Sequence, residues 1–127
     1  MSIRKIEKYR EEYEEELLAL LKKEPDWNTY TNEQSLEVFK STLLNSETYI
    51  CKGDSCICGY IRAIVDTFGV YISELYVAPN FRKNGYGKAL LAKVKSQYLG
   101  QEVYVLSDED LYYENLGYTH VGSVFQL

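Results

Sequence analysis

The hexapeptide RKNGYG, Arg82–Gly87, places two cations and two glycines directly before a stretch of helical periodicity. Glycine adopts positive φ angles without steric cost and lets other groups approach the backbone closely. The first N–H groups of a helix have no partner inside the helix, and they attract anions, above all phosphate. The hexapeptide therefore predicts a phosphate-binding turn at the start of a helix.

The charge distribution supports this interpretation. Of the 14 basic residues in the chain, five lie between residues 76 and 100, where there is no acidic residue. The rest of the chain carries nine basic against 19 acidic residues, so the positive field is local to the turn. This balance argues against a nucleic-acid surface spread over the whole domain.

Length and composition indicate one domain, residues 1–127, that folds alone. Of its 127 residues 46% are hydrophobic, and a chain of this size buries about two-thirds of the surface exposed when unfolded. No apolar run approaches the ~18 residues of a membrane span. The charged start MSIRKIEKYR lacks the apolar core of a signal peptide. We expect a cytoplasmic protein that does not enter a membrane.

The N-terminal third predicts a strand and two helices. Residues 1–7 have strand character, and apolar residues then recur at helical spacing over 9–21 until Pro25 stops the pattern. Thr31 and Gln34 have the spacing of a capping box, which predicts the start of the second helix.

Three β-rich runs follow, TYICKG, CICGYIRAIVDTFG and VYISELYVA, and they predict a three-stranded meander. Pro79 ends the third strand. Within that strand, Tyr71, Ser73, Leu75 and Val77 alternate with Ile72, Glu74 and Tyr76.

The chain has three cysteines, Cys51, Cys56 and Cys58, in a C-x4-C-x-C pattern. An odd count with no neighbouring histidine fits neither a disulfide framework nor a zinc site, so no metal site is predicted. We interpret the cysteines as small reduced apolar residues in a hairpin turned by residues 52–55. In that hairpin, Cys51 and Cys56 would face each other across the turn.

Four further elements are predicted after the turn. GKALLAKVKSQY has an apolar face opposite its lysines and predicts a helix, and EVYVLS predicts a buried strand. DEDLYYENLG predicts a short helix closed by Gly117, and YTHVGSVFQL a final strand. The order β-α-α-β-β-β-α-β-α-β predicts an α+β fold with a central mixed, mostly antiparallel sheet flanked by helices.

Two motifs, in this order, resemble those of the GCN5-related N-acetyltransferases, the GNAT family. LYVAPNFRKNGYGKALL is similar to the family's acetyl-CoA-binding motif, whose R/Q-x-x-G-x-G/A maps onto Arg82, Gly85 and Gly87. YYENLGY, residues 112–118, is similar to the C-terminal F/Y-Y-x-x-x-G-F/Y motif. The resemblance implies a three-layer GNAT fold, acetyl-CoA as acetyl donor with CoA as product, and an amine as acceptor.

The resemblance also implies which residues hold the cofactor. In such a fold the strand before the turn splays from its neighbour, so backbone groups near Leu75 and Val77 would hydrogen-bond the pantetheine amides. The N–H groups of residues 83–88 would wrap the pyrophosphate, and Arg82, Lys83 and Lys88 would add cationic contacts to the phosphates. The cofactor-binding candidates are Leu75, Tyr76, Val77, Arg82, Lys83, Asn84, Gly85, Tyr86, Gly87 and Lys88.

Acetyl transfer to an amine needs a neutral acceptor, a donor to the oxyanion and a proton for the leaving thiolate. By motif position Tyr113 is the acid, and a backbone N–H near Val77 polarises the carbonyl. Two carboxylates are alternatives for the base: Glu74 on the cofactor strand, and Asp108, which either acts through water or caps the next helix. His120 lies past the tyrosine motif and is given a surface or strand role.

Two classes of function fit these residues. The first is an N-acetyltransferase that moves the acetyl group of acetyl-CoA to a primary amine of a small molecule or peptide by direct attack in a ternary complex. The second is a non-catalytic acyl-CoA-binding or sensor module on the same fold. The acid-rich composition favours a cationic acceptor, and a homodimer is common in the resembled family.

Overall fold

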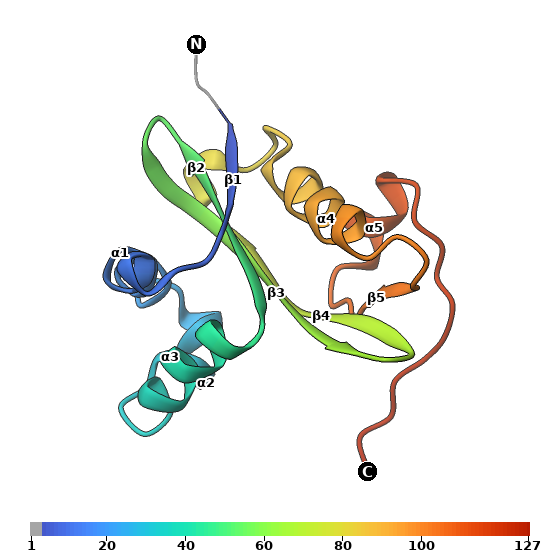
Figure 1. Cartoon of the computed structure of the whole chain (residues 1–127), viewed down its shortest axis with the longest axis horizontal. Coiled ribbons are helices and arrows are strands. Elements are labelled where there is room, and N and C mark those ends of the chain that lie inside the picture. The colour runs from blue at the N-terminus through green and yellow to red at the C-terminus, as the bar shows by residue number, and fades with distance from the viewer. Residues whose placement is uncertain (1–3) are drawn as a thin grey trace.

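The computed structural model describes residues 4–127 as one sheet with helices on both sides (Figure 1). The strands are β1 (Lys5–Lys8), β2 (Glu47–Gly53), β3 (Cys56–Asp66), β4 (Gly69–Val77) and β5 (Val103–Val105). The α-helices are α1 (Glu14–Leu21), α2 (Asn28–Thr31), α3 (Leu36–Asn45), α4 (Tyr86–Gln97) and α5 (Asp110–Asn115). Short 3₁₀ turns at Glu11–Tyr13, Pro25–Trp27 and Pro79–Phe81 precede α1, α2 and α4. Within residues 4–127, none of the helices is long and apolar enough to cross a bilayer.

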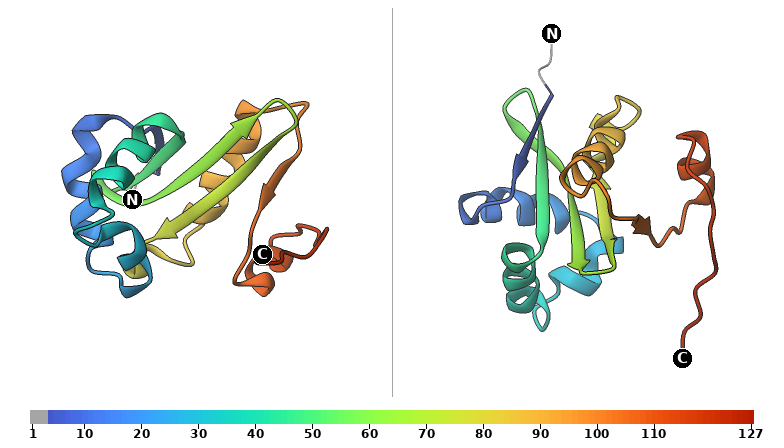
Figure 2. Two further views of the ribbon diagram at one scale, coloured as in Figure 1. Left: turned by 90° about the horizontal axis from the view of Figure 1, so that it is seen from below. Right: turned by 45° about the vertical axis from the view of Figure 1, so that its right-hand side comes forward.

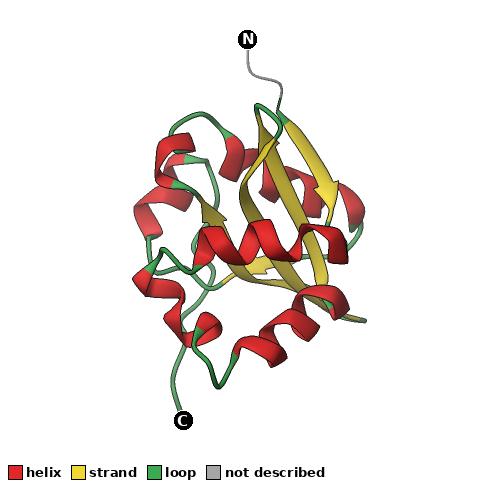
Figure 3. Ribbon diagram, turned by 90° about the vertical axis from the view of Figure 1, so that its left-hand side faces the viewer, coloured by secondary structure: helices red, strands yellow, loops and turns green. Residues whose placement is uncertain are grey.

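The sheet has the strand order β1-β2-β3-β4-β5. Its neighbours are antiparallel except for β4 and β5, which run parallel. Helices α1 and α3 pack on one face and α4 on the other, so the molecule has three layers (Figures 1 and 3). The predicted fold class, a mixed and mostly antiparallel sheet flanked by helices, is confirmed.

Two apolar clusters join these layers, one on each face of the sheet. The first contains Leu17, Leu21, Phe39, Leu43, Ile50 and Tyr60. The second contains Ile61, Val70, Ile72, Leu90, Leu91 and Val94. Because successive side chains of a strand point to opposite faces, β3 contributes to both clusters through the adjacent Tyr60 and Ile61.

A β-bulge interrupts the pairing of β3 with β4. Arg62 is opposite Glu74, but the next residue of β3, Ala63, is opposite Ile72. Ser73 is therefore the extra residue on β4. Such an insertion breaks the strict alternation of side chains at that point.

The bulge changes which residues of β4 share a face. Ile72, Leu75 and Val77 all pack with the α4 cluster, whereas Tyr76 belongs to the opposite cluster and Glu74 turns to that same side. Uninterrupted alternation grouped Ile72 with Glu74 and Tyr76. The structure keeps Glu74 and Tyr76 on one face but places Ile72 on the other, so the grouping is wrong for Ile72. The inserted residue exchanges the two faces halfway along the strand.

Strands β4 and β5 separate where the site begins. Their parallel ladder runs from the pair Val70–Val103 to the pair Ile72–Val105 and then stops, while β4 continues to Val77. Figure 2 shows β5 diverging from β4 toward α5. The second half of β4 therefore has a strand neighbour on one side only.

The N-terminal elements agree in type with the sequence pattern. β1 covers Lys5–Lys8, and residues 1–3 of the predicted strand lie outside the described residues. Helix α1 ends at Leu21, ahead of Pro25, as predicted. The additional short helix α2 follows Pro25 and was not predicted.

The predicted capping box is wrong. The Thr31 hydroxyl donates to the carbonyl oxygen of Trp27, one turn back, and does not cap α3. Instead Asn32 Oδ1 accepts the N–H groups of Gln34 and Ser35, both at 3.0 Å. Asparagine forms this turn readily because its short side chain reaches backbone groups two and three residues ahead.

The cysteine pairing also differs from the prediction. The β2–β3 hairpin turns over two residues, 54–55, both with positive φ, so Cys56 pairs with Gly53 and is exposed. A bulge after Cys51 then brings Cys58 beside it, with the two Sγ atoms 3.3 Å apart. Cys51 therefore faces Cys58 and not Cys56, because the shorter turn and the bulge shift the register.

The predicted final strand is wrong. Residues 118–127 have no regular secondary structure, and Val121, Val124 and Phe125 are exposed. In Figures 1 and 2 this segment runs past β5 to the C-terminus. β5 offers an edge of only three residues, and Gly122 lowers the strand preference of the segment.

Candidate active site

The turn predicted to bind phosphate connects β4 to α4. Gly85 is the N-cap of α4 with φ of 84°, and Lys83 also has a left-handed backbone, with φ of 65°. Positive φ is uncommon for a residue other than glycine, and such strain concentrates at functional sites. No side chain within residues 4–127 caps α4, so the N–H groups of its first turn are open to a ligand.

Three side chains hold the turn in this shape. Arg82 Nε donates to the carbonyl oxygen of Val77 at 2.7 Å, and the Asn84 amide donates to the carbonyl oxygens of Phe81 and Arg82. Arg4 Nη2 donates to the carbonyl oxygen of Asn84 at 2.6 Å. Arg4 was not among the predicted site residues, since a single arginine near the chain start carries no motif signal.

The predicted cationic contacts surround the turn. Arg82, Lys83 and Lys88 are all exposed there. Tyr86 is buried, and its ring meets Phe81 edge-on with 5.8 Å between centroids. Tyr86 is thus largely a packing residue, and it also lines a small cavity with Arg4 and Asn84.

Gly87 lies in the first turn of α4 and faces α5. A Cβ at this position would overlap the hydroxyl oxygen of Tyr112, and it would lie 3.9 Å from Cγ2 of Val77. The end of β4, the start of α4 and helix α5 thus meet over this glycine.

The outer side of β4 presents backbone groups that no strand neighbour pairs, although the carbonyl of Val77 already accepts a hydrogen bond from Arg82 Nε. The N–H of Ala78 donates to the carbonyl of Cys58 on β3 at 2.7 Å. Because backbone direction alternates along a strand, the N–H and C=O groups of Val77 and Leu75 point the other way, where β5 has diverged. Together with the uncapped turn at Gly85, these groups fit the amides and the diphosphate of an acyl-CoA.

The Tyr76 side chain lies on the opposite face of the sheet. Its ring meets Trp27 edge-on at 4.9 Å, and its hydroxyl donates to Glu24 Oε1 at 2.9 Å. Burial, followed by the Glu24 carboxylate, raises the pKa of Tyr76. The structure therefore places Tyr76 with an aromatic and acidic cluster at the end of α1, away from the α4 face.

Glu74, one of the two base candidates, is buried in an ion pair. Arg62 donates to both of its carboxylate oxygens, from Nε at 2.8 Å and from Nη2 at 2.6 Å. The Tyr60 hydroxyl also donates to Glu74, at 3.1 Å, and receives a hydrogen bond from Trp27 Nε1. Burial, followed by the Glu74 charge, raises the pKa of Tyr60. The Glu74 carboxylate is therefore already engaged on several sides.

We expect Glu74→Gln to lower the free energy of unfolding by about 3 kcal/mol, because it leaves Arg62 as a buried charge without a counter-charge. Urea denaturation measures this. Glu37→Gln is the matched control, since Glu37 pairs with Lys40 on the surface at 3.4 Å and should cost little. A Glu74→Gln variant as stable as its parent would show that the ion pair is dispensable.

Asp108, the other base candidate, is exposed in the loop between β5 and α5. The Ser107 hydroxyl oxygen accepts the N–H of Glu109 at 3.0 Å, so Ser107 organises the start of α5. Within residues 4–127 no side chain caps this helix in the usual way. Asp108 thus retains a free carboxylate near Tyr113, whose pKa it helps to raise.

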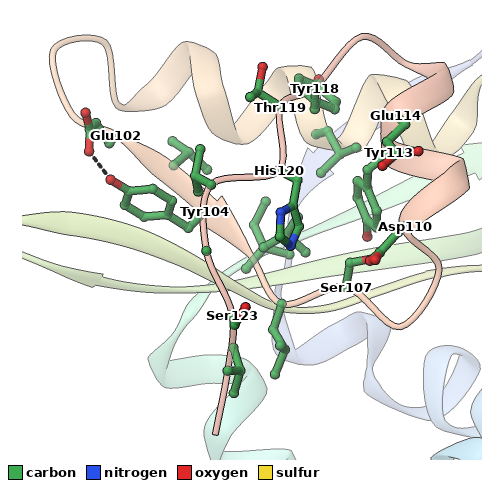
Figure 4. Close-up of a pocket in the computed structure, with 18 of the residues that line it drawn as sticks. Glu102, Tyr104, Ser107, Asp110, Tyr113, Glu114, Tyr118, Thr119, His120 and Ser123 are labelled. Atoms are coloured by element: carbon green, nitrogen blue, oxygen red, sulfur yellow. Dashed lines mark hydrogen bonds between the residues drawn. The ribbon is translucent and has the colours of Figure 1, made fainter.

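Tyr113, the predicted acid, lines an open cavity of about 880 Å³ between β5, α5 and residues 118–124. Figure 4 shows its ring directed into this space near Ser107 and Asp110. Burial, then Tyr112 and the acidic residues of the loop, raises the pKa of Tyr113 to about 12. His120 lines the same cavity from the C-terminal segment and is itself exposed.

The fold is an α+β domain in which an uncapped helix start lies beside two diverging strands, an arrangement that suits a phosphate-containing ligand. The sequence profile of the acetyltransferase (GNAT) domain matches residues 45–120, more than half of the chain. The chain therefore belongs to the GNAT acetyltransferase family. Among curated proteins, none matches the sequence significantly.

Solved structures share the fold at low sequence identity. The aminoglycoside N-acetyltransferase AAC(6′)-Iy in complex with CoA has a TM-score of 0.81 and 19% identity, over 100% of this chain and 95% of that one. AAC(6′)-Iy with the bisubstrate analogue CoA-S-monomethyl-acetylneamine has a TM-score of 0.80 and 18% identity, over 98% and 97%. Ribosomal-protein-alanine N-acetyltransferase from Brucella melitensis biovar Abortus 2308 has a TM-score of 0.76 and 15% identity, over 98% of each chain.

Proposed function

We propose that this protein is an N-acetyltransferase that moves the acetyl group of acetyl-CoA to a primary amine by direct attack in a ternary complex. The observation that carries this proposal is that two sets of unpaired backbone groups lie next to each other. The uncapped first turn of α4 at Gly85 leads to the outward-facing backbone of Val77 and Leu75 on the splayed strand. Family membership, and the CoA complex of AAC(6′)-Iy, support acetyl-CoA as the donor.

Acetyl-CoA supplies the activated acetyl thioester, and the residues of the chain bind and polarise it. A backbone N–H near Val77 donates to the thioester oxygen as negative charge develops there. The acceptor nitrogen forms a bond to the acetyl carbon, the carbon–sulfur bond breaks, and the Tyr113 hydroxyl gives its proton to the leaving thiolate. With its pKa raised to about 12, Tyr113 holds that proton at neutral pH.

Asp108 is assigned as the base that takes the proton of the acceptor ammonium, through water. Its carboxylate is exposed beside Tyr113, whereas Glu74, the alternative, would first have to leave its ion pair with Arg62. The acid limb of the kcat/KM profile tests this choice. It should be lost in Asp108→Asn, and a limb that persists there would return the role to Glu74 or to solvent.

The proposed acceptor is a cationic amine of a small molecule or a peptide. The chain has a net charge of −5, and Asp110 and Glu114 line the same cavity as the Tyr113 ring. A carboxylate next to aromatic rings suits an ammonium group. Solved relatives with this fold are named for acceptors of both kinds, an aminoglycoside and a ribosomal-protein alanine.

Release of free CoA thiol over a panel of amines tests this function. The panel contains polyamines, aminoglycosides, and peptides with a lysine or a free N-terminus, each with acetyl-CoA and with a longer acyl-CoA. We expect acceptor-dependent thiol release with at least one class. Tight CoA binding without release for any amine would establish the alternative, a non-catalytic acyl-CoA-binding or sensor module.

We also propose that the protein works in the cytoplasm and without nucleic acid or membrane. The excess of acidic over basic residues outside the turn supports the absence of a nucleic-acid partner. Fractionation of cells that express the tagged chain tests the location. Light scattering of the purified chain tests the further proposal of a homodimer.

A further inference from the structure

Two adjacent tyrosines of α5 point into different spaces. Tyr112 and Tyr113 meet edge-on, with 5.0 Å between ring centroids and 85° between ring planes. Tyr113 lines the cavity beside β5. The Tyr112 hydroxyl instead lies over Gly87, where it fills the position that a Cβ would take. The hydroxyls of these two neighbouring residues therefore point to different places.

The position over Gly87 is part of the proposed diphosphate site. Gly87 belongs to the first turn of α4, whose N–H groups no side chain within residues 4–127 caps. Val77 is at the end of the splayed strand, and its Cγ2 lies 3.9 Å from the position that a Cβ of Gly87 would take. A group held here is therefore next to both the proposed phosphate-binding turn and the end of β4.

The Tyr112 hydroxyl is available to a ligand. It makes no hydrogen bond to another residue in the described range, and about one-third of the side chain is exposed. Burial, followed by the neighbouring Tyr118 and Glu109, raises the pKa of Tyr112, so the hydroxyl is protonated at neutral pH. A protonated phenol can donate a hydrogen bond to an anion, and it carries no negative charge that would repel the anion.

The geometry points to Tyr112 as a further cofactor-binding residue, whose hydroxyl donates a hydrogen bond to a phosphate oxygen of the acyl-CoA diphosphate. This inference rests on the proposed function only for the identity of the ligand. The hydroxyl contact ties α5 to the turn when the cofactor binds, and it leaves the neighbouring Tyr113 for proton transfer. The motif YYENLGY matches a family pattern that accepts phenylalanine at this position, so the contact is a property of this chain.

Calorimetric titration of two ligands into three proteins tests the assignment. The ligands are CoA and dephospho-CoA, which lacks the 3′-phosphate but keeps the diphosphate. The proteins are the parent, Tyr112→Phe and Tyr113→Phe, each checked for an unchanged Tm. A hydrogen bond to a charged phosphate group is lost only in Tyr112→Phe, so we expect its Kd to rise about tenfold for both ligands. Tyr113→Phe should keep nearly the affinity of the parent for both ligands, since its hydroxyl is not placed at the diphosphate.

Each of the other possible results contradicts a particular statement of the inference. Equal or tighter CoA binding by Tyr112→Phe would overturn it, because the hydroxyl would then only fill space that the ligand needs. A weakening for CoA but not for dephospho-CoA would move the contact to the 3′-phosphate and overturn the diphosphate assignment. A parent that binds neither ligand would overturn the proposed function together with this inference, whereas binding by the parent separates the two.

Discussion

Gly85→Val is expected to abolish CoA binding while the protein stays folded. Gly85 has φ of 84° at the N-cap of α4, and a β-branched residue there is strained by at least about 1–2 kcal/mol. A Cβ would also lie 3.1 Å from Nη2 of Arg4, the residue that braces the turn. If the backbone relaxes the strain, or shifts away from Arg4, it moves the N–H groups that are proposed to bind the diphosphate. Calorimetric titration with CoA measures the loss.

Gly100→Val is the matched control for this variant. Gly100 follows the other end of α4, has φ of 93°, and has nothing within 4 Å of the position that a Cβ would take. The substitution therefore introduces the same kind of backbone strain far from the turn. We expect a lower Tm in both variants but loss of CoA affinity only in Gly85→Val. Normal affinity in Gly85→Val would remove the turn from the cofactor site.

The turn could be predicted from the sequence because its shape is set locally. Two glycines and an adjacent helix specify where positive φ and unpaired N–H groups occur, and the structure has Gly85 at the helix N-cap. Each of the three meander strands could be predicted for a similar reason, since β-rich runs and turn residues are neighbours in the chain. The family motifs added the order in which the turn and the tyrosines occur.

The bulge at Ser73 could not be predicted in this way. Nothing in VYISELYVA marks an inserted residue, and only the pairing with β3 shows that Arg62 is opposite Glu74. The ion pair between these residues joins positions 12 apart in the sequence. Sequence alternation therefore predicted a strand correctly but could not show that the Glu74 carboxylate is buried and engaged.

In the C-terminal region too, the sequence does not show in which direction a side chain points. The motif identifies Tyr113, yet both tyrosines of YYENLGY have the same chemistry, and only the packing of α5 shows that Tyr112 faces Gly87. The predicted strand over residues 118–127 failed because apolar residues alone do not supply a strand partner. Pairing depends on the length of the neighbouring β5, which is three residues.

Tyr113→Phe is expected to lower kcat by a factor of about 10² to 10⁴ with a competent amine, the range typical of general acid catalysis. Only the hydroxyl is removed, and the ring still packs beside β5 and α4. CoA affinity and Tm should therefore stay close to those of the parent. A fall in kcat without a change in CoA affinity assigns the hydroxyl to a step after binding.

The pH dependence gives an independent readout of the same group. An unperturbed tyrosine loses its proton near pH 10, but the pKa of Tyr113 is raised to about 12, mainly by burial. A raised pKa favours the protonated form, so the acid should stay competent as pH rises from 7 through 10. We expect no alkaline loss of kcat from this residue below pH 10 in the parent. Turnover in Tyr113→Phe equal to that of the parent would leave Tyr113 with a packing role and move the search for the acid to Tyr112 or to solvent.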